Sequence, residues 1–306
     1  MERTRTTGAS DIPIGNWVDR LAPAPVRPYL RLARLDRPIG TWLLLLPGWW
    51  GIALASSAWP DLSLLVLFAI GAVVMRGAGC TLNDIADRDF DARVARTASR
   101  PIPSGQVTVP QAAAFMAILL LIGLAVLLQF NAFAAAVGAA SLILVAVYPF
   151  MKRITYWPQA WLGLTFNWGA LLGWAAVRGD LALPALLLYA AGLFWTLGYD
   201  TIYAHQDKQD DALIGVKSTA LKLGAATKPW LAGFYGLAVV LLALSGILAG
   251  LGWPFYAALA LAALHFGWQV RSVALDDGKD CLAKFQSNRD VGLILFAGIV
   301  AGRLIA

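Results

Sequence analysis

The chain has 306 residues, of which 59% are hydrophobic and 14% are charged. A soluble domain usually carries about a quarter charged residues, so this composition excludes an ordinary water-soluble fold. The formal net charge of +6 could suit nucleic acid, but basic residues in a membrane protein set its orientation, and we expect no nucleic-acid partner. Two cysteines and two histidines are too few for a disulfide framework or a zinc site. No obligate protein partner is evident.

Apolar segments of spanning length follow a polar N-terminal stretch. Residues 1–30 are polar and rich in proline, without the early apolar run of a signal peptide. A bilayer-spanning helix needs about 20 mostly apolar residues, and continuous apolar runs lack the alternation of a membrane β-barrel. We therefore predict an all-α membrane protein in which residues 31–306 form a single transmembrane domain of nine helices. The predicted segments are residues 39–59, 62–82, 110–130, 132–150, 159–177, 181–202, 230–250, 254–273 and 290–306.

The basic residues predict an orientation. With the N-terminus inside, 21 of the 24 Lys and Arg residues fall before the first predicted helix or in the inner loops. Cytoplasmic loops typically carry this excess. We expect the N-terminus, residues 83–109 and residues 203–229 to face the cytoplasm of a bacterial inner membrane.

The first acidic cluster (residues 83–91) follows the second predicted helix. Asn83, Asp87 and Asp91 are spaced i, i+4, i+8, and Asp84 lies beside them. If the helix continues past residue 82, the three evenly spaced side chains share one face. Carboxylates at i, i+4 repel one another, and a bound cation between them relieves that repulsion.

The second acidic cluster (residues 200–211) follows the sixth predicted helix. Asp207 and Asp211 repeat the i, i+4 spacing, and Asp200 shares their face if the helix is continuous. Oxygen ligands suit Mg²⁺ or Ca²⁺, and Mg²⁺ typically combines one or two carboxylates with substrate phosphate. The two clusters could therefore bracket a diphosphate through Mg²⁺. The alternative is that these are solvated loop charges paired with neighbouring basic residues, namely Arg88, Arg93, Arg96 and Lys208.

Basic residues near the predicted inner helix ends are candidates to bind a diphosphate. Arg37, Lys152, Arg153 and Lys217 lie at these ends, where they could neutralise a leaving group. Arg76 lies within the second predicted helix, and charges inside spans usually face a polar cavity.

At these residues the sequence resembles the UbiA superfamily of membrane prenyltransferases, in the form that prenylates 4-hydroxybenzoate for ubiquinone. The resemblance covers about residues 30–300. The segments that carry it are Asn83–Asp91, Arg96-Thr97, Arg100–Gly105, Tyr148–Arg153, Tyr199–Asp211 and Ile214–Ala220.

The resemblance implies nine helices around a central cavity and a set of residue roles. Mg²⁺ would be held by Asn83, Asp87, Asp91, Asp207 and Asp211, and these four aspartates would act in catalysis with Arg153. The substrate-binding candidates are Arg37, Arg76, Asn83, Asp84, Lys152, Tyr203 and Lys217.

The implied reaction transfers a polyprenyl group from its diphosphate to 4-hydroxybenzoate, ortho to the hydroxyl. Another acceptor, such as a naphthoate, homogentisate, haem or a lipid, remains an alternative. A transporter would favour acidic residues near the bilayer midplane, whereas nearly all of these lie at inner helix ends. A structural scaffold leaves both clusters unexplained.

Overall fold

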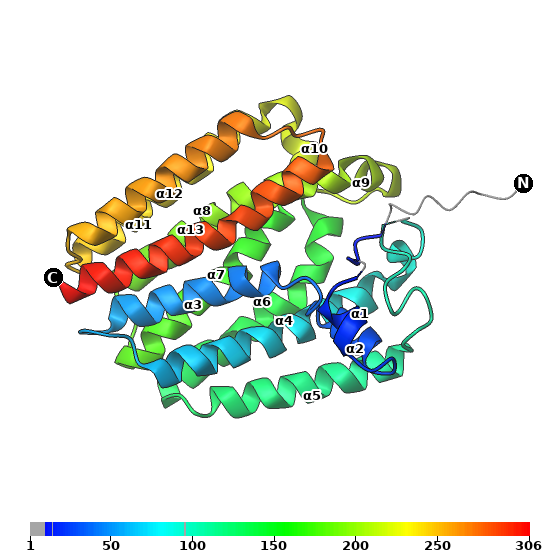
Figure 1. Cartoon of the computed structure of the whole chain (residues 1–306), viewed down its shortest axis with the longest axis horizontal. Coiled ribbons are helices and arrows are strands. Elements are labelled where there is room, and N and C mark those ends of the chain that lie inside the picture. The colour runs from blue at the N-terminus through cyan, green and yellow to red at the C-terminus, as the bar shows by residue number, and fades with distance from the viewer. Residues whose placement is uncertain (1–9, 14, 95) are drawn as a thin grey trace, which may run out of the picture. The chain divides into compact units, whose positions relative to one another are not determined.

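The structure is a computed structural model that describes residues 10–13, 15–94 and 96–306, without the side chains of residues 210 and 214. All regular elements in these ranges are helical, which confirms the all-α fold (Figure 1). The elements are α1 (Trp17–Leu21), α2 (Arg27–Leu32), α3 (Ile39–Ala55), α4 (Leu62–Asp91), α5 (Val109–Leu127), α6 (Ala132–Ile154), α7 (Pro158–Arg178), α8 (Leu183–Ala204), η1 (His205–Asp207), α9 (Lys208–Ile214), α10 (Thr219–Leu223), η2 (Gly224–Ala226), α11 (Thr227–Leu248), α12 (Trp253–Ser272) and α13 (Gly278–Leu304).

The chain divides into two compact units. The first comprises Gly71–Ala125 and the described residues up to Thr41, and the second comprises Trp42–Ile70 and Val126–Ala306. The boundaries between them fall within α3, α4 and α5. A single transmembrane domain over residues 31–306 stays a prediction, and part of the polar segment 1–30 lies outside the described residues.

Each of the nine predicted segments lies on a helix, and five helical stretches in the described ranges are long and apolar enough to cross a membrane. They confirm the integral membrane character of the chain. The other four segments lie on α3, which has 17 residues, and on α7, α12 and α13, which carry polar side chains such as Asn167, Gln269 and Lys284. Nine spans and a central cavity stay predictions. The five stretches are Leu62–Asp91, Val109–Leu127, Ala132–Ile154, Leu183–Asp207 and Thr219–Leu248.

Two helices extend well beyond their predicted ends. α4 continues through the first acidic cluster to Asp91, instead of ending near residue 82. α13 begins at Gly278, far before the predicted start at residue 290. The Asp277 carboxylate caps α13 by accepting from the backbone N–H groups of Lys279 and Asp280. A search for apolar runs misses both extensions because the added turns are polar.

In the second unit, α8 packs against α7 and α11, and α12 packs against α11 and α13 (Figure 1). Glycines bring the backbones of α3 and α7 into contact. A Cβ atom added at Gly51 would collide with the Ala170 carbonyl oxygen, and one added at Gly173 would collide with the Gly48 carbonyl oxygen. Small residues at such crossings are typical of membrane helices, because association there depends on close packing.

Tryptophan side chains connect several helices of the second unit. The indole N–H of the fully buried Trp50 in α3 donates to the Gly292 carbonyl of α13 at 2.8 Å. Trp161 and Trp168 of α7 donate to carbonyls of α6 at 2.8 Å, and Trp49 of α3 donates to the Leu65 carbonyl of α4 at 3.0 Å. These tryptophans therefore join neighbouring helices through hydrogen bonds.

The first unit has a small apolar core beside the first acidic cluster. Leu32 of α2 packs with Ile102 and Val107 of the loop after α4 and with Ala112 of α5, and Ile85 of α4 contacts this group. Leu32 and Ala112 are fully buried. The core therefore holds the part of the loop that contains Ile102 and Val107 against the last turns of α4.

Candidate active site

The first acidic cluster lies on one continuous helix, as its spacing predicts. Asn83, Asp87 and Asp91 all belong to α4, and Asp91 is its last residue. Asp87 is fully buried and Asp91 is buried, while Asn83 is half-buried. The expectation of one shared face is confirmed, but the idea of solvated loop charges is wrong for the two aspartates.

Arginines from outside the cluster bind two of its aspartates. The Arg34 Nη2 donates to Asp84 Oδ1 at 2.6 Å, and the Arg100 Nη1 donates to the same oxygen at 3.3 Å. Arg100 Nη1 also donates to Asp91 Oδ2 at 2.9 Å. Asp84 is fully buried, and both arginine side chains are nearly so. Arg88, one of the partners considered from sequence, instead pairs with its exposed neighbour Asp89.

A third carboxylate, that of Asp11, joins this network from the N-terminal segment. Its Oδ2 accepts from Arg100 Nε at 3.1 Å and from Arg100 Nη2 at 2.8 Å, and lies 3.6 Å from nitrogens of Arg37 and Arg96. Burial alone would raise the pKa of Asp11, but the positive charges of Arg100, Arg37 and Arg96 outweigh it and lower that pKa. Burial likewise opposes the charge of Arg100, and Asp84, Asp11 and Asp91 outweigh it and raise the pKa of Arg100.

The two remaining basic candidates of the first unit are engaged with their own surroundings. Arg37 donates from Nη1 to Asp36 Oδ2 and to the Asp11 carbonyl, both at 2.9 Å. The guanidinium of Arg76 lies against Gly40, where an added Cβ would come within 2.5 Å of Arg76 Nη2. Gly40 therefore provides the space in which the charged end of Arg76 rests.

The second acidic cluster lies on an interrupted helix. Asp200 belongs to α8, Asp207 ends the 3₁₀ turn η1, and Asp211 belongs to α9. A 3₁₀ turn has about 3.0 residues per turn instead of 3.6. The continuous α-helix assumed from the sequence is therefore wrong here, and the shared face of Asp200 with Asp207 and Asp211 does not follow from it.

The structure brings three basic candidates of the second unit into one region. The backbone N–H of Lys217 donates to the Lys152 carbonyl at 2.9 Å, and Lys217 Nζ donates to the Ile154 carbonyl at 3.0 Å. Arg153 lies between these carbonyls in sequence, with its guanidinium 5.8 Å from the centre of the Phe150 ring. The end of α6 is thus fastened to the segment that follows the second acidic cluster.

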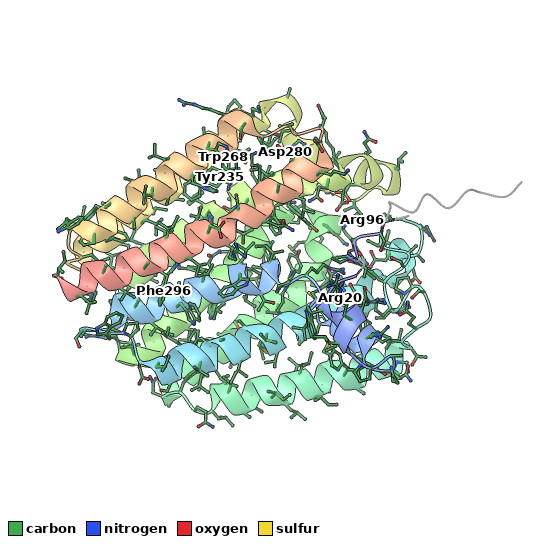
Figure 2. All side chains as sticks on the ribbon, viewed as in Figure 1. Arg20, Arg96, Tyr235, Trp268, Asp280 and Phe296 are labelled. Atoms are coloured by element: carbon green, nitrogen blue, oxygen red, sulfur yellow. The ribbon has the colours of Figure 1, made fainter. Side chains whose placement is uncertain are left out.

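Tyr203 stands beside a polar stretch of α13. Its ring lies 4.4 Å from that of Phe285, and the next residue toward the N-terminus, Lys284, is buried. Lys284 Nζ donates to Asp280 Oδ1 at 3.1 Å and lies 4.1 Å from the centre of the Trp268 ring. Figure 2 labels Trp268 and Asp280 at this end of α12 and α13. The charge of Lys284 is therefore matched within the second unit.

The donor types of the first acidic cluster fit a hard cation. Amide and carboxylate oxygens recur every four residues along α4, and Mg²⁺ needs one or two such protein ligands when phosphate oxygens complete its shell. No group of three or more His, Cys, Asp or Glu side chains arranged to hold a metal occurs among the described residues.

Sequence reasoning missed Arg34, Arg100 and Asp11. Arg100 belongs to a segment that carries the family resemblance, so the sequence marked its position but did not indicate its function. Arg34 adopts a left-handed backbone conformation with φ of 58°, which nothing in its side chain predicts. Asp11 lies outside the region of resemblance, and its contacts depend on tertiary structure.

The family model described as "UbiA prenyltransferase family" matches residues 44–296. The chain is 54% identical to the mitochondrial 4-hydroxybenzoate polyprenyltransferase of Arabidopsis thaliana, over 94% of this chain and 72% of that one. It is also 54% identical to the Homo sapiens protein of the same name, over 92% of this chain and 77% of that one.

Two solved structures share the fold. A UbiA homolog from Aeropyrum pernix K1, solved in the apo state, has a TM-score of 0.73 and 28% identity, covering 85% of this chain and 96% of that one. A UbiA homolog from Archaeoglobus fulgidus bound to GPP and Mg²⁺ has a TM-score of 0.69 and 18% identity, covering 90% of this chain and 99% of that one. At that identity the second likeness concerns the fold alone.

Proposed function

The chain belongs to the UbiA prenyltransferase family, and we propose that it transfers a polyprenyl group from a polyprenyl diphosphate to 4-hydroxybenzoate in ubiquinone biosynthesis. The observation that carries this proposal is the 54% identity to a 4-hydroxybenzoate polyprenyltransferase over 94% of the chain. The names of the similar proteins from Rattus norvegicus and Homo sapiens agree on this acceptor.

The first acidic cluster is proposed to hold the diphosphate end of the donor. Asn83, Asp87 and Asp91 would supply oxygen ligands to Mg²⁺, and Asp84 and Arg76 would contribute to binding. When bound, Mg²⁺ would neutralise charge on the departing diphosphate. The helical spacing on α4 and the burial of Asp87 and Asp91 support this role.

The second acidic cluster is proposed to bind diphosphate through Asp207 and Asp211, an assignment that rests on the family resemblance. Lys152, Arg153 and Lys217 would bind phosphate oxygens by charge-assisted hydrogen bonds. The backbone link between Lys152 and Lys217 supports a joint role for them. Arg37 and Tyr203 are proposed as further substrate contacts.

The proposed reaction forms one carbon–carbon bond and breaks one carbon–oxygen bond. The allylic carbon of the donor loses diphosphate, and the ring carbon ortho to the hydroxyl of 4-hydroxybenzoate supplies the electron pair for the new bond. The ring then loses its proton to a basic group and regains aromaticity. Positive charge around the leaving group would favour ionisation. Exclusion of water would keep the allylic cation from being hydrolysed before the ring attacks it.

We propose that the N-terminus and both acidic clusters face the cytoplasm of a bacterial inner membrane. The asymmetry of the basic residues supports this orientation. The similar proteins from A. thaliana and H. sapiens are mitochondrial, so they give no support to the bacterial compartment.

The test uses purified protein with Mg²⁺, a prenyl diphosphate and a panel of aromatic acids, with products identified by mass spectrometry. We expect 4-hydroxybenzoate to be prenylated ortho to its hydroxyl. Prenylation of a naphthoate or homogentisate, with 4-hydroxybenzoate left unchanged, would overturn the acceptor and leave the family assignment in place.

A further inference from the structure

We infer that Asp11 and Arg100 form a positioning pair that orients the carboxylates of Asp84 and Asp91 for the metal-bound diphosphate. The inference rests on the proposed function, because it concerns the same site. It adds a residue of the N-terminal segment, which lies outside the region of family resemblance.

The guanidinium of Arg100 joins the N-terminal segment to α4. Its Nε and Nη2 both donate to Asp11 Oδ2, at 3.1 and 2.8 Å, while Nη1 donates to Asp91 Oδ2 at 2.9 Å and to Asp84 Oδ1 at 3.3 Å. A guanidinium is planar and rigid, so fixing one of its edges fixes the direction of the N–H groups on the other. Asp11 therefore determines where Arg100 points.

Asp11 is itself held in place by its backbone. Its N–H donates to the Arg96 carbonyl at 3.0 Å, and its carbonyl accepts from Arg37 Nη1 at 2.9 Å. The side chains of Asp11 and Arg100 are 10% and 11% exposed. Few water molecules can compete for these bonds, and charge interactions are stronger in such surroundings than at the surface.

Asp91 needs external support because it is the last residue of α4. Helix ends fray, so a carboxylate there is poorly oriented by the helix alone. Thr97 Oγ1 donates to the Asp91 carbonyl at 2.9 Å, which fixes the backbone. Arg100 fixes the carboxylate, and removal of such supporting partners typically lowers metal affinity or activity about 10- to 100-fold.

The competing explanation is that this network only stabilises the fold. The same segment offers a matched control, because Asp19 accepts from Arg31 Nη2 at 2.5 Å. This pair is 22% and 21% exposed, and the other oxygen of Asp19 accepts from the Gly15 N–H of the same segment. Asp19→Asn therefore removes an N-terminal ion pair without touching the positioning pair.

The experiment compares the full-length unaltered protein with Asp11→Asn, Arg100→Lys, the double variant and Asp19→Asn. Two quantities are measured as the Mg²⁺ concentration is varied. The first is the rate of prenyl transfer, and the second is the rise in melting temperature in the presence of an unreactive prenyl thiodiphosphate. We expect Asp11→Asn and Arg100→Lys each to raise the half-saturating Mg²⁺ concentration about 10- to 100-fold in both titrations. The double variant should add little to either single change, because the two residues act together.

A purely structural role would lower the Mg²⁺-free melting temperature and leave half-saturation unchanged, and that result in Asp11→Asn would overturn the inference. If Asp11→Asn does not fold, Asp11→Glu is tested instead, because it retains the charge but displaces Arg100. An unchanged half-saturating Mg²⁺ concentration in Asp11→Glu would then overturn the inference. If the unaltered protein shows no Mg²⁺-dependent transfer, the proposed function fails and the inference fails with it. An active, Mg²⁺-dependent parent with an unaffected Asp11 variant overturns the inference alone.

Discussion

Arg34 Nη2 donates a hydrogen bond to Asp84 Oδ1 at 2.6 Å, and the backbone of Arg34 is left-handed, with φ of 58°. Both side chains are buried. A left-handed conformation costs a residue with a Cβ about 1–2 kcal/mol. The ion pair therefore retains a side chain at a position where the backbone alone would favour glycine.

Replacement of Arg34 should separate the side-chain and backbone contributions. Arg34→Ala leaves part of the buried Asp84 charge uncompensated, and we expect a loss of about 3 kcal/mol in stability, seen as a lower melting temperature in detergent. Arg34→Gly loses the same ion pair but relieves the backbone, so it should be about 1 kcal/mol more stable than the alanine variant. Arg31→Ala, which breaks the partly exposed pair with Asp19, should cost about 1 kcal/mol or less. Equal melting of the alanine and glycine variants would contradict this account.

Loss of the Asp87 charge should impair turnover more than substrate binding. If its carboxylate acts on the leaving diphosphate, Asp87→Asn should lower kcat about 100-fold or more, and Asp207→Ala should do the same. Arg153→Ala should mainly weaken binding of the prenyl diphosphate. The place of Asp87 near a helix end suggests an exposed side chain, but the structure shows it fully buried. Asparagine is therefore preferred to alanine at residue 87, because it removes the charge and keeps the size of the side chain.

The control for Asp87 is Asp89→Asn on the same helix. Asp89 has a side chain that is 77% exposed, so its replacement should leave kcat within about a factor of two, as surface changes have small effects. If Asp87→Asn and Asp207→Ala both turn over at the wild-type rate, the two acidic clusters do not take part in catalysis.

Single cysteines can test the predicted orientation. The native Cys80 and Cys281 are buried, so a membrane-impermeant maleimide should label them slowly. Gln106→Cys and Leu213→Cys introduce thiols at exposed sites in the expected cytoplasmic loops, and Ser57→Cys does so after α3 on the expected outer side. In intact cells we expect Ser57→Cys alone to react quickly, with the other two reacting after permeabilisation. Fast labelling of Gln106→Cys in intact cells would reverse the topology.

The contact between α3 and α7 should be intolerant of a single methyl group. A Cβ at Gly173 would collide with the Gly48 carbonyl oxygen, which as backbone cannot move aside easily. We expect Gly173→Ala to lose about 1–3 kcal/mol through overpacking. Gly236→Ala in α11 meets nothing within 4 Å, and should be neutral or gain up to about 1 kcal/mol through helix propensity. Equal melting temperatures for the two variants would argue against the close contact.

The sequence was sufficient to predict the long apolar helices and the position of the first acidic cluster on one of them. Each apolar run that it contains lies on a helix of the described chain, because burial in lipid demands such runs. The spacing of Asn83, Asp87 and Asp91 also predicted their common helix correctly. The polar first turns of α13 escaped detection because hydropathy does not register a capped helix such as that begun by Asp277.

The partners of the first acidic cluster could not be predicted in the same way. Arg88 and Arg93 are close in sequence to the aspartates, yet Arg34 and Arg100 bind Asp84. Which arginine reaches a carboxylate depends on how the described part of the N-terminal segment and residues 96–108 pack on α4. The interruption of the second cluster by η1 is likewise a property of local backbone geometry, which the i, i+4 spacing of Asp207 and Asp211 does not encode.

The indole hydrogen bonds between helices give the protein an intrinsic optical reporter. Trp50, Trp161 and Trp168 each donate to a carbonyl of a neighbouring helix, so separating those helices breaks the bond and changes the surroundings of the ring. Indole fluorescence shifts to longer wavelength in polar surroundings. A variant that keeps only Trp50, Trp161 and Trp168 of the 13 tryptophans would therefore report on these helix contacts without any added dye.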